Sequence, residues 1–188
     1  MLDPKEWGLQ TCDKNGKFVT LRKFDDFVDG DHMVLKTDSG CAHTANSHYP
    51  RTEFRQLKTW NSRGDAHLSF DVAIQKLPVK KPEVCFAQIK TATKEMQLLY
   101  HAGKVICRTL DARHIKMGTY KLGDWVHVDI HVISGQVDVK IGDATCGFHA
   151  DFTGAYFKCG NYMQSNAAIE GNKTTGSEVW IKNISLKN

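Results

Sequence analysis

The chain has 188 residues, of which 41% are hydrophobic and 24% charged, and its formal net charge at pH 7 is +4. This composition is that of an ordinary globular protein, and the length suits one domain, expected over residues 1–188. No run approaches the roughly 20 apolar residues of a membrane span. No basic cluster points to nucleic acid. Neither a membrane nor a nucleic-acid partner is therefore predicted, whereas the small positive excess suits a polyanionic ligand.

Short runs of alternating apolar and polar residues dominate the chain, which is the period of half-buried strands. Helices are scarce, and a short one is expected near residues 25–27 or 111–114. Many short strands separated by turn signals predict an all-β sandwich or barrel. The clearest strands are at residues 67–74, 84–89, 96–100 and 104–107, then 125–132 and 136–141 as a hairpin, and finally 178–186.

Six cysteines are present, and none forms a CxxC pair, so a zinc site is not expected. Their even number allows about 15 disulfide pairings, among which the sequence does not choose. Buried free thiols are equally ordinary at such positions. The loop Asp29-Gly30-Asp31 offers oxygens of the kind that bind calcium, but no full ligand set accompanies it. No metal or cofactor is predicted.

The segment 49–55, with sequence YPRTEFR, carries polar side chains within a strand pattern. At strand period, Arg51, Glu53 and Arg55 share one face, while Thr52 and Phe54 face the other way. Two guanidiniums beside a carboxylate can hold a substrate carboxylate bidentately, with Glu53 keeping them oriented. Taken alone, this pattern is more typical of a solvated surface strand.

Two later segments add polar residues of the same kind. In FAQIK, residues 86–90, Gln88 and Lys90 share a face and Ile89 points to the core. In YFKCGNYMQ, residues 156–164, Phe157, Cys159 and Met163 point away, and Gly160 leaves room for a close approach. The other face of this strand carries Tyr156, Lys158, Tyr162 and Gln164. Strand tyrosines are more often packing residues than catalysts, so the weight comes from the three segments occurring together, in order.

In that order, RTEFR, QIK and YFKCGNYMQ resemble the three signature strands of alginate lyases of polysaccharide lyase family 7. Their usual forms are R-[ST]-E-L/F-R, Q-I/V-H and Y-F-K-A-G-x-Y-x-Q. The resemblance spans about residues 47–164. It implies a β-jelly roll of two antiparallel sheets with a concave substrate cleft. It also implies a secreted, monomeric lyase that cleaves an anionic uronic-acid polysaccharide by β-elimination, any signal peptide being absent from this chain.

The resemblance assigns roles to individual residues. Arg51 and Gln88 would neutralise the uronate carboxylate, so that charge can develop in an enolate-like transition state. Tyr162 would serve as the acid and, in syn elimination, as the base too. Because a tyrosine with a pKa near ~10 is a poor base, we expect a cationic neighbour to lower that pKa, the candidates being Arg51, Lys158 and Lys90. The expected substrate-binding or orienting residues are Arg55, Lys158, Glu53, Tyr156 and Gln164.

One position departs from the family pattern. Lys90 stands where the family has a histidine that is linked to the anti route needed for guluronate. A protonated lysine is a poor base, so we interpret Lys90 as an electrostatic contributor at the active site. The expected preference is for mannuronate-rich alginate or β-glucuronan over guluronate, which keeps a β-1,4-glucuronan lyase as the alternative. His48, three residues before Arg51, is a second candidate base.

Two other classes compete with a lyase. A non-catalytic carbohydrate-binding module is the main rival, because jelly rolls host many such modules. The four tryptophans (Trp7, Trp60, Trp125 and Trp180) are candidates for a sugar-stacking platform, although core packing is the more common role of such residues. A binding module, however, has no need for Arg51, Gln88 and Tyr162 to converge. A glycoside hydrolase needs two carboxylates across a cleft, and the signature faces offer mainly Glu53.

Overall fold

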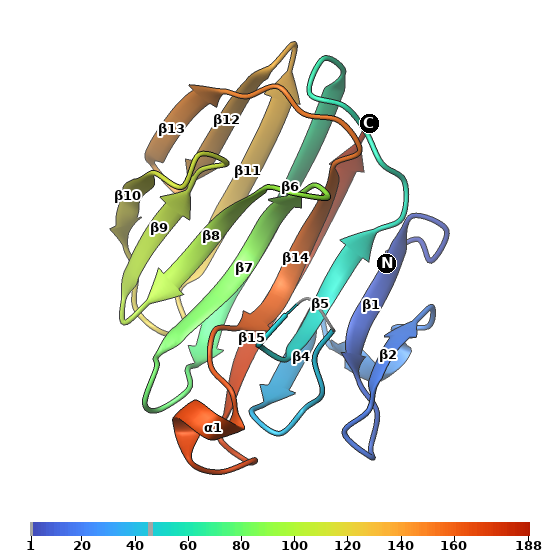
Figure 1. Cartoon of the computed structure of the whole chain (residues 1–188), viewed down its shortest axis with the longest axis vertical. Helices are drawn as coiled ribbons and strands as arrows, with labels where there is room; N and C mark the ends of the chain where they lie inside the picture. Colours follow the sequence, from blue (N-terminus) through green and yellow to red (C-terminus); the bar gives the residue numbers. More distant parts are fainter. Residues whose placement is uncertain (1, 45–46) are drawn as a thin grey trace.

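A computed structural model of the chain describes residues 2–44 and 47–188, and it consists of two antiparallel sheets packed face to face (Figure 1). Sheet A has the strand order β10-β9-β8-β7-β14-β5-β1-β2. Sheet B has the order β13-β12-β11-β6-β15-β4-β3. The all-β sandwich predicted from the alternating pattern is confirmed.

The bounds of the elements are as follows. Sheet A contains β1 (Trp7–Cys12), β2 (Phe18–Leu21), β5 (Arg51–Gln56), β7 (Glu83–Lys90), β8 (Glu95–His101), β9 (Lys104–Arg108), β10 (His114–Thr119) and β14 (Tyr156–Met163). Sheet B contains β3 (Val28–Asp29), β4 (His32–Asp38), β6 (Asp65–Lys76), β11 (Trp125–Ile133), β12 (Gln136–Ile141), β13 (Ala144–His149) and β15 (Gly176–Lys187). Two short helices, η1 (Asp25–Phe27) and α1 (Ala167–Glu170), complete the described part of the chain.

Helix prediction was right at one place and wrong at another. Residues 25–27 form the 3-10 helix η1. Residues 111–114 do not form a helix, because Thr109 closes a turn there: its backbone N–H donates to the Arg113 carbonyl at 2.9 Å, and its hydroxyl accepts from the Arg113 N–H at 3.1 Å. The unpredicted helix α1 begins at Asn166, whose side chain accepts from the Ile169 N–H. None of the described helices is long and apolar enough to span a membrane.

The hydrophobic core lies between the sheets and fixes the strands that carry the polar segments. Phe54 of β5, Ile89 of β7 and Phe157 of β14 are fully buried on its sheet A side. Burial of side chains of this size stabilises a fold by about 1.5–3 kcal/mol each. Each strand is therefore held through its apolar face, which leaves its polar face to carry the chemistry.

A buried polar bridge ties the two sheets together beneath β14. The Asn161 side-chain amide donates to the carbonyls of Leu35 and Ser177 at 2.9 and 3.0 Å, and its oxygen accepts from the Ser177 hydroxyl at 2.8 Å. Every polar atom of this fully buried side chain is thus satisfied, as a buried amide requires. The neighbouring Gly160 has φ +134°, and a Cβ there would lie 2.8 Å from Leu35 Cδ1. The close approach predicted at this glycine is confirmed.

A disulfide joins Cys12, at the end of β1, to Cys41, in the segment that leads to β5. Their Cα atoms are 5.8 Å apart. The other four cysteines (Cys85, Cys107, Cys146 and Cys159) are free thiols. The sequence alone did not determine which cysteines pair.

Candidate active site

Strand register brings the three polar segments together on one face of sheet A. Lys158 of β14 lies between two partners, Arg55 of β5 and Gln88 of β7. Tyr162 of β14 pairs with Arg51 of β5 four residues further along, with the pair of Gly160 and Glu53 between them. We call this surface the polar face of sheet A. The strand pairing therefore agrees with the faces that strand period predicted for these segments.

At the centre of the polar face is Glu53, which is fully buried. Its Oε2 accepts from the ammonium of Lys158 and lies 3.4 Å from Arg51 Nη1. Its Oε1 accepts from the side-chain amide of Gln88. A buried carboxylate is tolerated only when charges and hydrogen bonds compensate its lost hydration, and here two cations and an amide do so. The cluster as a whole keeps a net positive charge.

Arg55 does not take the place predicted for it beside Glu53. Its guanidinium lies over the ring of Tyr156, with Arg55 Cζ 4.4 Å from the ring centroid, in a cation–π arrangement. Lys158, from the neighbouring strand, supplies the second cation instead. The sequence pattern of β5 alone cannot reveal that Lys158 replaces Arg55 beside Glu53, because this contact depends on which residues of β14 lie next to β5.

Lys158 is an unusual cation because almost no water reaches it. Its side chain is only 4% exposed. Burial, reinforced by the nearby Arg51 guanidinium, lowers the pKa of Lys158 to about 8, although Glu53 acts in the opposite direction. The charge of the cluster is therefore sensitive to mildly alkaline pH.

Tyr162 is held by contacts to Ser47 and Arg51. Its hydroxyl lies 3.0 Å from Ser47 Oγ, which also accepts from Arg51 Nη2 at 2.7 Å. Arg51 Cζ is 4.0 Å from the Tyr162 ring centroid. Burial raises the pKa of Tyr162, and the Ser47 hydrogen bond and the Arg51 charge offset this only in part. Arg51 thus acts in the expected direction, but the pKa of Tyr162 is not lowered overall in the free protein, because the loss of hydration outweighs that charge. Nothing in the sequence pattern marked Ser47.

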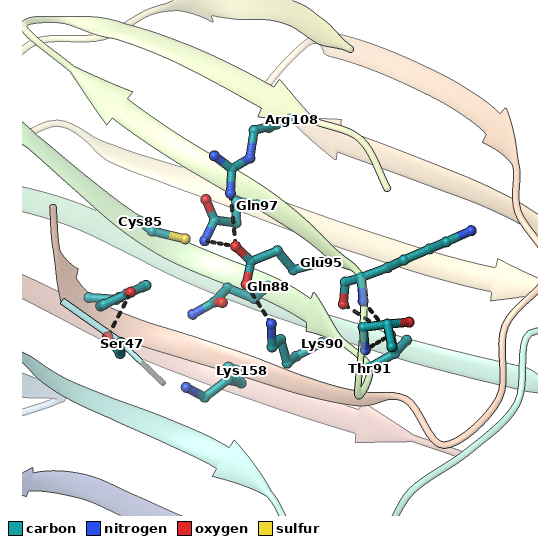
Figure 2. Close-up of polar contacts among 12 residues, drawn as sticks. Ser47, Cys85, Gln88, Lys90, Thr91, Glu95, Gln97, Arg108 and Lys158 are labelled. Atoms are coloured by element: carbon teal, nitrogen blue, oxygen red, sulfur yellow. Dashed lines mark hydrogen bonds and ion pairs between the residues drawn. The ribbon is translucent and has the colours of Figure 1, made fainter. Parts of the chain in front are cut away.

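Lys90 reaches a different carboxylate, Glu95, which the sequence analysis also missed. Lys90 Nζ lies 2.9 Å from Glu95 Oε2. Glu95 Oε1 accepts from Arg108 Nη2 at 2.9 Å and from Gln97 Nε2 at 3.1 Å. Figure 2 shows this second cluster around Glu95, with Gln88 between it and Lys158. Lys90 therefore belongs to the polar face but not to the contacts of Glu53.

Two predicted site residues make no side-chain contact with this centre. His48 is exposed, and among residues 2–44 and 47–188 its imidazole has no hydrogen-bond partner; only its carbonyl accepts, from Asn166 Nδ2 at 3.1 Å. Gln164 donates to the backbone carbonyl of Tyr162 at 3.3 Å, so it braces the strand end. Both residues flank the centre in sequence, and the fold directs their side chains elsewhere.

Two open surface depressions lie on sheet B, away from this centre. One of about 420 Å³ is lined by residues that include Asp129 and Asp138, and one of about 370 Å³ by residues that include His32 and Lys182. Asp31, from the loop considered for calcium, pairs with Lys182 at 2.8 Å. Among the described residues, no group of three or more histidine, cysteine or acidic side chains is placed to hold a metal. The converging charges are on the polar face of sheet A.

Comparison with solved structures defines the class: jelly-roll polysaccharide lyases share this architecture. An alginate lyase of polysaccharide lyase family 7 superposes with a TM-score of 0.86 at 24% identity, covering 98% of this chain and 95% of that one. The alginate lyase from Corynebacterium sp. gives 0.86 at 20% identity, covering 99% and 95%. An alginate lyase from Pseudomonas aeruginosa gives 0.85 at 20% identity, covering 100% of both chains.

The family model described as alginate lyase matches residues 5–188, so the chain belongs to the alginate lyase family. It is an enzyme, a polysaccharide lyase that acts on alginate. No sequence among curated proteins matches the chain significantly. The resemblance read from the three signature segments is confirmed over nearly the whole chain.

The buried pairing of Glu53 makes a prediction for stability. Glu53→Gln leaves Lys158 and Arg51 without their counter-charge in a dry site, so we expect a loss of about 3–5 kcal/mol in the free energy of unfolding. Glu95→Gln is the matched control, because its pairs are about one-third exposed and should be worth at most about 1 kcal/mol. Urea unfolding of both variants measures this, and equal losses would contradict the buried pairing.

The pKa of Lys158 makes a second prediction. Below about pH 8 the residue carries its ammonium, and above it the charge is lost, so kcat/KM should decline as pH rises through about 8. Lys158→Arg keeps a positive charge at all accessible pH values. In that variant the decline should move upward, toward the raised pKa of Tyr162. The measurement is kcat/KM against pH on one polymer; a decline at the same pH in both proteins would refute the role of Lys158.

Proposed function

We propose that this protein cleaves mannuronate-rich alginate by syn β-elimination, with Tyr162 exchanging the protons and Arg51 and Gln88 neutralising the substrate carboxylate. The observation that carries the proposal is the contact of Arg51 with both Glu53 and Tyr162. One cation thereby lies between the buried charge centre and the phenol hydroxyl. The polymer is cut when the C5 proton is removed and the oxygen on C4 leaves with its bonding electrons.

The C5 proton is weakly acidic because the adjacent carboxylate is already negative. Arg51 carries the positive charge that can oppose it, and its guanidinium carbon lies 4.0 Å from the Tyr162 ring centroid. Gln88 donates one amide hydrogen to Glu53 and retains a second donor. The net positive charge around Glu53 stabilises the enolate-like transition state more than the ground state, which is what accelerates the reaction.

Tyr162 holds its proton in the free enzyme, because burial raises its pKa. It therefore begins as the acid. We assign it a concerted exchange in which the phenol gives its proton to the departing C4 oxygen while the phenol oxygen accepts the C5 proton. The phenol is restored at the end, so no separate base is required. Arg51, 4.0 Å from the ring centroid, stabilises the transient negative charge on this oxygen.

Lys90 supports the assignment of the syn route. Lys90 forms an ion pair with Glu95 at 2.9 Å, and an ammonium has no lone pair with which to accept a proton. The exposed imidazole of His48 makes no contact with the centre, so Tyr162 is the better candidate base. A syn route suits mannuronate and also glucuronate, which has the same configuration at C4 and C5. A β-1,4-glucuronan lyase is therefore the second candidate function.

We further propose that the enzyme works outside the cell as a monomer. Its substrate is an extended polymer, and the Cys12–Cys41 disulfide suits an oxidising compartment. A non-catalytic carbohydrate-binding module remains the rival reading of the fold, and the cleavage assays below distinguish the two.

Tyr162→Phe removes only the hydroxyl that exchanges protons, so cleavage should fall by at least about 10³-fold while polymer binding persists. The readout is the ultraviolet absorbance of the unsaturated uronide formed on mannuronate-rich alginate. Tyr120→Phe is the matched control, because it removes a hydroxyl that donates to the Ile141 carbonyl away from the polar face, so most activity should remain. Substantial cleavage by Tyr162→Phe would remove Tyr162 from the acid role, and a wild-type protein that binds uronans without cleaving them would favour the binding module.

The substrate preference is tested with polymannuronate, β-glucuronan and polyguluronate side by side. We expect polyguluronate to be the slowest, because Lys90 supplies no base on the face opposite Tyr162. Lys90→His introduces a group that titrates near neutrality, so it should raise the relative rate on polyguluronate. Faster cleavage of polyguluronate than of the other two polymers by the unmodified enzyme would show that the argument from Lys90 is wrong.

A further inference from the structure

Two of the four free thiols meet between the edges of the two sheets. Cys107 is on β9 of sheet A, and Cys146 is on β13 of sheet B. Cys107 is fully buried in the hydrophobic core, and Cys146 packs against the same core. Their thiols share a hydrogen bond, which raises the pKa of Cys107, as its burial also does, and lowers the pKa of Cys146. Sulfur atoms from opposite sheets are therefore in contact.

This pair lies at one lateral edge of the sandwich. Strands β10 and β9 are the last two of sheet A on this side, and β13 is the last strand of sheet B. Figure 1 shows β9, β10 and β13 on the same side of the molecule, and β10 packs against β13. The two sheets are separate hydrogen-bonded sets of strands, so contacts between side chains hold this edge closed.

The other two free thiols are arranged differently. Cys85 packs with Leu99 and Tyr162, and its thiol donates to the Ala87 carbonyl at 3.3 Å. Cys159 lies in the core between the sheets, where burial raises its pKa. These two cysteines thus belong to different clusters of buried side chains. Among the described free thiols, Cys107 and Cys146 are the pair that is hydrogen-bonded sulfur to sulfur.

Cys146 is the more reactive member of the pair. It is half-buried on an edge strand, whereas Cys107 is closed off from solvent. The hydrogen bond from Cys107 lowers the pKa of Cys146 and outweighs the opposing effects of its burial and of Asp138. A lower pKa increases the fraction of thiolate, which is the form that attacks a disulfide. An external disulfide therefore reacts with Cys146 first.

We propose that Cys107 and Cys146 form a second disulfide, which joins β9 to β13 when the protein meets a low-molecular-weight disulfide such as oxidised glutathione. The Cys146 thiolate attacks the reagent and expels one thiolate, which leaves a mixed disulfide on Cys146. Cys107 then gives up its proton, attacks the Cys146 sulfur and expels the second thiolate. Two protein thiols thus become one protein disulfide, and the reagent takes up their two hydrogens as two thiols.

The crosslink closes a long loop through β10, β11 and β12. It removes conformations from the unfolded chain and so stabilises the folded one. Neither sulfur contacts Glu53 or Tyr162 in the described hydrogen bonds, so the effect is on stability and not on the chemistry of cleavage. The proposal is independent of the polymer that the enzyme cleaves, and the cleavage assays can fail without affecting it.

Non-reducing peptide mapping of the full chain, after incubation of the folded protein with oxidised glutathione, tests the pairing. We expect a peptide that links Cys107 to Cys146, and a loss of half of the four free thiols. In Cys107→Ser the exchange stops after its first step, so Cys146 should keep a glutathione adduct. In Cys146→Ser the buried Cys107 should stay a thiol. The proposal is overturned if the unmodified protein keeps both thiols or joins either of them to a different cysteine.

Thermal unfolding measures the consequence for stability. In the oxidised state Cys146→Ser should melt roughly 5–15 °C below the unmodified protein, and the difference should vanish when both proteins are fully reduced. Cys159→Ala is the matched control, because a lost packing contact lowers the Tm equally in both redox states. An equal deficit of Cys146→Ser in the two states would show that its thiol only fills space. If Cys146→Ser misfolds, Cys107→Ala repeats the comparison.

Discussion

The buried carboxylate of Glu53 is the constraint on which the polar face of sheet A depends. A charge removed from water must find compensating partners within hydrogen-bonding distance, and these come from β5, β7 and β14. The three strands must therefore be adjacent and in one register. The same requirement that makes Glu53 costly to bury also concentrates positive charge at the place where a uronate carboxylate has to be neutralised.

The site is rigid because two independent sets of contacts hold its strands from below. Apolar side chains such as Phe54 and Phe157 fill the core, while Asn161 bonds across it to the strands of sheet B. The polar atoms above them consequently need little reorganisation when the reaction begins, which is the condition under which electrostatic stabilisation is most effective. The Glu95 cluster, by contrast, is about one-third exposed, so solvent competes with its ion pairs.

Much of this arrangement could be predicted from the sequence, because alternation along a strand determines which side chains share a face. That reasoning gave the polar face of each segment and anticipated the tight approach at Gly160, whereas the resemblance to the lyase family implied that Arg51, Gln88 and Tyr162 come together. It failed where a contact depends on a neighbouring strand or a loop. Lys158, and not Arg55, pairs with Glu53, and Lys90 pairs with Glu95. The register between neighbouring strands determines both ion pairs. Ser47 reaches Tyr162 from an irregular segment, where no periodicity exists to be read.

The disulfide between Cys12 and Cys41 bears on how the enzyme matures. It anchors to β1 the start of the segment that later carries Ser47, the hydroxyl bonded to both Tyr162 and Arg51. A disulfide restricts the conformations open to the chain between its two cysteines. In a reducing environment that segment would keep its sequence but lose its tether, and the hydroxyl would spend less time at the phenol. The place of this hydroxyl at the catalytic centre is thereby linked to an environment in which thiols can be oxidised.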